Sequence, residues 1–128
     1  MAAGGIRWLR VVAGAVAAHA MVIGFAALCS VLPNGTGILL YAVVPVCLIA
    51  TFVSGFWAAR PARELFVVHG LLAGTLTALA SAILSWRTTL PMVYVVANCL
   101  KMAGGAAGGW LAAVYEGRVT RFQTTTPK

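Results

Sequence analysis

One lysine lies deep inside a long apolar segment near the end of the chain. Lys101 is the only charged residue between Pro91 and Tyr115, a stretch long enough to cross a lipid bilayer as a helix. It would lie on the order of 15 Å from Pro91 along the helix axis, close to the bilayer centre. A lysine at that depth costs roughly 2.5–3.5 kcal/mol on insertion scales, so something must offset its charge.

The polar residues around Lys101 could contact an anion or a polar solute. Asn98 lies one helical turn before Lys101 and shares its helix face, and Tyr94 lies about one turn earlier still. His19, in the middle of the first apolar segment, is a candidate for proton transfer or substrate contact. Each has a structural alternative, because a lysine can extend toward the headgroups and a neutral histidine can bond to a neighbouring helix.

Glycines at helical spacing predict close helix packing beside the same lysine. The residues expected to pack helices are Gly70, Gly74, Gly104, Gly105, Gly108 and Gly109. They form small-xxx-small patterns, which let helix backbones approach closely. Because Gly105 follows Lys101 by four residues, the polar face continues into glycines and should point toward protein or water. The lysine is then either structural, beside a packing face, or functional, contacting an anion or a partner's carboxylate.

The composition is that of an integral membrane protein. The chain has 128 residues, 62% of them hydrophobic and only 9% charged, which is too apolar for a soluble domain of this size. We expect a single membrane domain over residues 1–128. The net charge of +7 does not indicate nucleic-acid binding, because the basic residues flank apolar segments and form no patch. The expected surroundings are therefore a lipid bilayer.

No residue pattern indicates an enzyme, a metal site or a cofactor. Cys29, Cys47 and Cys99 lie singly in apolar segments, without a CxxC motif or a nearby histidine at metal-binding spacing. The only carboxylates are Glu64 and Glu116, both expected at a membrane surface. Paired-carboxylate catalysis inside the membrane is therefore not expected.

The apolar segments predict an all-α fold, a bundle of four transmembrane helices. The expected helices cover residues 9–32, 38–59, 65–85 and 91–115, followed by a loose polar tail over 116–128. Turn-forming residues at 33–37 predict a tight hairpin between the first two helices.

The basic residues also predict orientation. One side of the membrane would collect Arg7, Arg10, Arg60, Arg63, Arg118, Arg121 and Lys128, and the other side would have Arg87 alone. Because lysine and arginine favour cytoplasmic loops, we expect a multi-pass protein of a bacterial inner membrane with both termini in the cytoplasm.

A weak internal repeat appears at an offset of 53 residues, which pairs Tyr41 with Tyr94 and Trp57 with Trp110. Two duplicated hairpins pointing the same way would be related by a pseudo-twofold axis along the membrane normal. The same spacing also follows from interfacial anchors that recur at similar depth, so both explanations stay open.

Three stretches together are similar to a pattern in small four-helix bacterial membrane proteins. They are Gly55–Ala62, His69–Gly74 and Gly104–Gly109, which give a glycine-rich second helix end, a His-Gly start of the third helix and a double-glycine fourth helix. The resemblance covers about half of the chain, and its motifs consist mostly of small residues. It implies a four-helix membrane fold and brings no activity with it.

Two hypotheses for function follow. The first is a non-enzymatic structural or accessory protein that packs with itself, as a homo-oligomer, or with a membrane-protein partner. The alternative is a small channel or transporter for an anion or polar solute, with Lys101 and Asn98 in its path.

Overall fold

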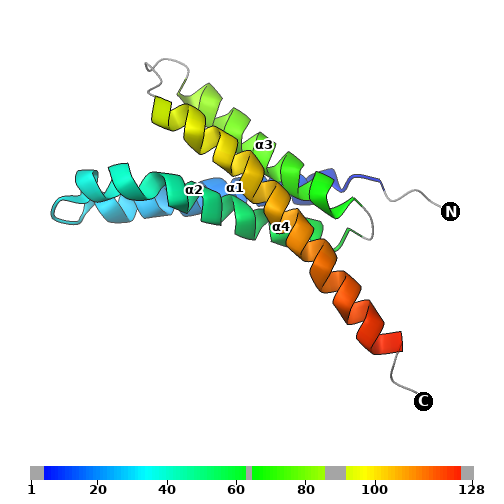
Figure 1. Cartoon of the computed structure of the whole chain (residues 1–128). Helices are drawn as coiled ribbons and strands as arrows, with labels where there is room; N and C mark the ends of the chain where they lie inside the picture. Colours follow the sequence, from blue (N-terminus) through cyan, green and yellow to red (C-terminus); the bar gives the residue numbers. More distant parts are fainter. Residues whose placement is uncertain (1–4, 63–64, 86–91, 125–128) are drawn as a thin grey trace.

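The computed structural model describes residues 5–62, 65–85 and 92–124, with side chains through residue 117. Within these ranges it contains four helices and no strands, so the all-α prediction is confirmed (Figure 1). The helices are α1 (Trp8–Ser30), α2 (Gly35–Ala59), α3 (Phe66–Leu84) and α4 (Met92–Thr124). The predictions that concern Arg63, Glu64, Arg87 and Lys128, and the side chains of Arg118 and Arg121, lie outside what is described.

Three of the helices, α1, α2 and α3, are long and apolar enough to cross a membrane. Only 17% of the most apolar window of α2 is buried inside the protein, so most of that window needs an apolar solvent around it. This is the character of a membrane protein. The helix α4 is not in this group, because Asn98, Lys101 and its glycines dilute the apolar residues, and its role as a fourth span stays a prediction.

Two helix boundaries differ from the expected ones by more than two residues. The first hairpin is tighter at the α2 end, because α2 begins at Gly35 rather than at 38. Asn34 precedes it with a left-handed φ of 63°, and a Cβ at Gly35 would collide with the carbonyl of Cys29. The helix α4 continues to Thr124, beyond the expected end at 115 and into the expected tail. No proline follows Tyr115 until Pro127, so the chain has no strong signal to stop there.

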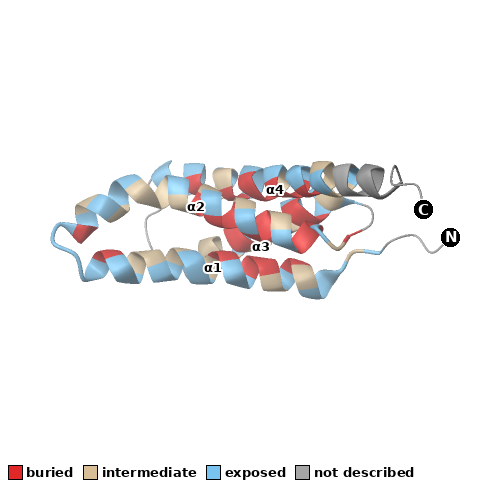
Figure 2. Cartoon of the chain, turned by 90° about the horizontal axis from the view of Figure 1, so that it is seen from below, coloured by how far each residue is buried: buried red, intermediate tan, exposed pale blue. Residues whose placement is uncertain are grey.

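The two helix pairs do not pack equivalently. Figure 1 shows α3 and α4 lying obliquely across α1 and α2. In Figure 2, α1 and α4 lie on opposite sides, with α2 and α3 between them. Among the described residues α2 contacts α3, whereas α1 does not contact α4. An axis exchanging the hairpins would make those two contacts equal, so the expected pseudo-twofold symmetry is not seen in the packing.

The helix α4 fits between α2 and α3 through two neighbouring rows of glycine. A Cβ at Gly104 would lie 2.5 Å from the Thr51 hydroxyl oxygen, and one at Gly108 would collide with the Phe52 carbonyl, so this row faces α2. Gly105 and Gly109 face α3 instead, against Gly70 and Phe66. The glycines expected at helix contacts thus all lie at such contacts, and every one of these contacts is within the chain.

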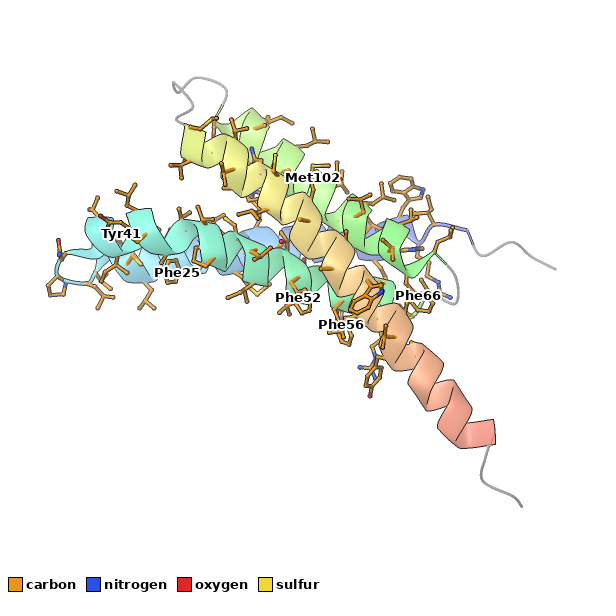
Figure 3. All side chains as sticks on the ribbon, in the orientation of Figure 1. Phe25, Tyr41, Phe52, Phe56, Phe66 and Met102 are labelled. Atoms are coloured by element: carbon orange, nitrogen blue, oxygen red, sulfur yellow. The ribbon has the colours of Figure 1, made fainter. Side chains whose placement is uncertain are left out.

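The ends of the bundle carry aromatic and charged side chains. Tyr41 lies toward the α1–α2 tip, whereas Phe56 and Phe66 lie toward the opposite end (Figure 3). There the Arg60 guanidinium carbon is 5.0 Å from the ring centroid of Tyr115, and its Nε is 3.4 Å from a carboxylate oxygen of Glu116. These contacts join the end of α2 to the later part of α4.

Candidate functional site

The side chain of Lys101 is buried, with only 5% of the residue exposed. Its position follows from Gly74, because a Cβ there would collide with the Lys101 carbonyl oxygen. Without that Cβ, α4 lies directly on α3 at this point. Gly70, Gly74 and Ser81 recur at spacings of four and seven residues and so lie on one face of α3. The glycine face of α3 therefore leads to a hydroxyl beside the lysine.

Two neutral oxygens accept hydrogen bonds from the Lys101 ammonium. Its Nζ donates to Ser81 Oγ at 2.5 Å and to Asn98 Oδ1 at 3.2 Å. These bonds use two of the three hydrogens of a lysine ammonium. The Asn98 amide group adds further N–H donors at the same place. The lysine is thus hydrogen-bonded, but its partners carry no negative charge.

His19 extends this cluster to α1. Its Nε2 lies 3.4 Å from Ser81 Oγ. Ser81 Oγ itself donates to the Thr77 carbonyl at 3.0 Å. We call Asn98, Lys101, Ser81 and His19 the polar cluster. It joins three otherwise apolar helices, α1, α3 and α4.

The polar cluster lies close to one end of α3. Ser81 is three residues before the last residue of that helix, about 5 Å along its axis. Lys101 is nine residues into α4, about 14 Å from its first residue. His19, Ser81 and Asn98 are half-buried, whereas Lys101 is buried beneath them. The shorter route from water to the lysine is therefore along the end of α3.

No carboxylate lies in the polar cluster. In the described part of the chain Glu116 is the only acidic side chain, and it contacts Arg60 at the far end of the bundle. On α2, the thiol of Cys47 is buried and close enough to interact electrostatically with Lys101. The described residues contain no group of three histidine, cysteine or acidic side chains placed to hold a metal ion.

Of the four residues predicted from sequence, three come together and one does not. Lys101, Asn98 and His19 are joined in the polar cluster, whereas Tyr94 is 44% exposed and has no hydrogen bond to it. The sequence did not connect Ser81 with these residues, although Ser81 lies between Lys101 and His19. Its spacing from Gly70 and Gly74, on the glycine face of α3, was the signal that would have found it.

The chain's other histidine is buried at the opposite end of α3 from the polar cluster. His69 is 1% exposed; its Nε2 accepts a hydrogen bond from the Arg7 backbone N–H at 3.0 Å, and its Nδ1 lies 2.9 Å from the Leu65 carbonyl. It therefore fastens the start of α1 to the start of α3. Because Nε2 is an acceptor, Nδ1 carries the hydrogen and the ring is neutral.

Comparison of the chain with protein-family models, with curated proteins and with solved structures finds no match. The chemistry of the polar cluster therefore rests on its own groups. It gathers one lysine amine, one amide, one hydroxyl and one imidazole at a point where the described residues place no carboxylate. Such a set offers hydrogen-bond donors and positive charge, which is what an anion requires.

Proposed function

We propose that the chain is a four-span protein of the bacterial inner membrane, with α4 as the fourth span and both termini in the cytoplasm. The close packing of α4 against α2 and α3 between Lys101 and Gly109 supports the fourth span. Arg10 contacts Trp57, and Arg60 contacts Glu116, so two of the basic residues expected in the cytoplasm occur at the end of the bundle where α1 begins and α2 ends.

Within this topology we propose that the protein binds a small anion at Lys101 and conducts or transports it across the membrane. The observation that supports this is a buried lysine whose only hydrogen-bond partners among the described residues are the neutral oxygens of Ser81 and Asn98. The third ammonium hydrogen and the Asn98 amide are donors for a ligand. An anion held there would supply the missing negative charge.

The energetic argument favours an anion over a purely structural lysine. A lysine buried inside a membrane span costs up to roughly 2.5–3.5 kcal/mol, the value at the helix centre, and hydrogen bonds to neutral groups return only part of that cost. A structural role needs only a hydroxyl or amide at position 101, which would avoid the charge altogether. The lysine is therefore best explained by a ligand that carries the opposite charge.

Flux through liposomes tests this function. Purified protein reconstituted in liposomes should release chloride or nitrate faster than empty liposomes. Lys101→Met should lower that flux roughly tenfold or more, because a hydrogen bond to a charged group contributes about 1.5–3 kcal/mol. The matched control is Lys128→Met, the same change at the chain's other lysine, which should leave flux unchanged.

The substituted protein must also be shown to fold. Lys101→Met keeps side-chain length and removes a buried charge, so its thermal stability in detergent should equal or exceed that of the wild type. Flux through the wild type no faster than through empty liposomes would contradict the proposal. So would a folded Lys101→Met protein with wild-type flux.

A second candidate function is association with another copy of the chain, as a structural or accessory protein. The glycines of α3 and α4 are occupied inside the chain, so they are not available for a partner. The face of α1 opposite its buried residues carries small exposed side chains at spacings of three or four, namely Ala17, Ala20, Gly24 and Ala27. Small residues in this pattern are typical of helix contacts in membranes.

A further inference from the structure

His19 and Lys101 are the two ends of a short hydrogen-bonded chain through Ser81. The bond from Lys101 Nζ to Ser81 Oγ is 2.5 Å, and Ser81 Oγ lies 3.4 Å from His19 Nε2. The two nitrogens are therefore no more than about 6 Å apart, a distance at which two unit charges interact strongly in a low dielectric. Both groups accept protons, so their charges are coupled.

The Ser81 hydroxyl can satisfy His19 in either protonation state. It has one hydrogen and two acceptors within reach, the Thr77 carbonyl at 3.0 Å and His19 Nε2 at 3.4 Å. When Nε2 has no proton, Ser81 can donate to it. When Nε2 is protonated, Ser81 can turn its hydrogen to Thr77 and accept from the imidazole. Neither state leaves an unpaired polar group, so the histidine can change charge without disrupting the packing.

Among the described residues, the titratable groups near His19 are positive or neutral. The titratable groups around it are Lys101 on α4 and, near Lys101, the buried Cys47 thiol on α2. The adjoining part of α3 contributes Ser81 and Thr77, which carry no charge. A protonated His19 beside the Lys101 ammonium would thus face unrelieved repulsion while the site holds no anion. An anion between them removes that repulsion.

We infer that a monovalent anion enters the polar cluster together with one proton, which His19 holds. The inference rests on the anion-binding function proposed above. The proton comes from water and bonds to His19 Nε2, Ser81 turns its hydrogen to the Thr77 carbonyl, and no covalent bond between heavy atoms changes. Release of the anion reverses both steps, so the protein carries a proton and an anion in the same direction.

Chloride binding measured against pH tests this inference. The anion-bound state holds one more proton than the free state, so chloride binding should strengthen as pH falls, by up to about tenfold per pH unit. The wild type should also take up close to one proton per chloride bound, which a pH indicator in weakly buffered detergent solution reports. His19→Gln should bind chloride more weakly than the wild type at low pH, and should lose most of the pH dependence and the proton uptake.

The other histidine provides the matched control. His69→Gln leaves His19 in place, so its chloride binding should keep the wild-type pH dependence. Chloride binding by the wild type without proton uptake would overturn the inference and leave the anion site standing. An unchanged pH slope in His19→Gln would do the same, since the proton would then bind elsewhere. The absence of any saturable chloride binding would instead refute the proposed function itself.

Discussion

Replacing Gly105 by alanine adds one methyl group where the backbones of three helices meet. A Cβ at position 105 would lie 3.0 Å from both the nitrogen and the Cα of Gly74, and closer still to the Gly70 carbonyl oxygen. On its other side, Gly105 already meets α2, because a Cβ at Gly55 would be 2.6 Å from the Gly105 carbonyl oxygen. The obstructing atoms belong to backbone, so no side chain can rotate away and α4 must shift.

The expected cost follows from two opposing terms. Overpacking of a well-packed core costs about 1–3 kcal/mol, and the rigid obstruction at Gly105 places it in the upper half of that range. Alanine recovers about 0.5–1 kcal/mol, because glycine is a poor residue for a helix interior. The net effect should be a loss of about 1–2 kcal/mol in the free energy of unfolding.

Unfolding in mixed detergent, followed by helical circular dichroism, measures this free energy. The control is Gly117→Ala on the same helix, where a Cβ would meet nothing within 4 Å. That variant should be as stable as the wild type or gain up to about 1 kcal/mol from helix propensity. If Gly105→Ala matched Gly117→Ala in stability, the close approach of α4 to α3 would be wrong.

Two further predictions concern topology and association. Reporter fusions at Lys128 and within Asn34–Gly37 should lie on opposite sides of the membrane. The Lys128 fusion should be cytoplasmic, because the basic residues cluster on that side. A periplasmic Lys128 fusion would contradict the proposed orientation. If α1 mediates association, Gly24→Leu should shift the protein toward a monomer in detergent, as measured by light scattering. The larger side chain would separate the α1 helices of the two copies. An unchanged mass would exclude this face as an interface.

The sequence predicted the helices well because their apolar segments are separated by turn residues. It also identified the glycines that pack helices, since small residues at a spacing of four have a clear physical meaning. It did not indicate that Gly104 and Gly108 face α2 whereas Gly105 and Gly109 face α3. That assignment depends on how the hairpins cross, which no local pattern encodes.

The candidate site was predicted only in part, because it also depends on how the helices cross. Asn98 shares a helix face with Lys101, so their contact followed from spacing alone. His19 stood out because a polar residue inside a span needs a partner, but the sequence did not name Ser81 as that partner. The sequence marked His69 only as part of the start of the third helix, and did not indicate its bond to the Arg7 backbone. The contacts of Ser81 and of His69 both join helices that are far apart in sequence, so no local pattern shows them.

The most direct measurement of the central claim is equilibrium binding of chloride to the purified protein in detergent. We expect one saturable site per chain in the wild type and in Lys128→Met, and none in a folded Lys101→Met protein. Equal binding by the wild type and Lys101→Met, or no saturable binding by the wild type, would contradict the claim that the buried lysine holds an anion.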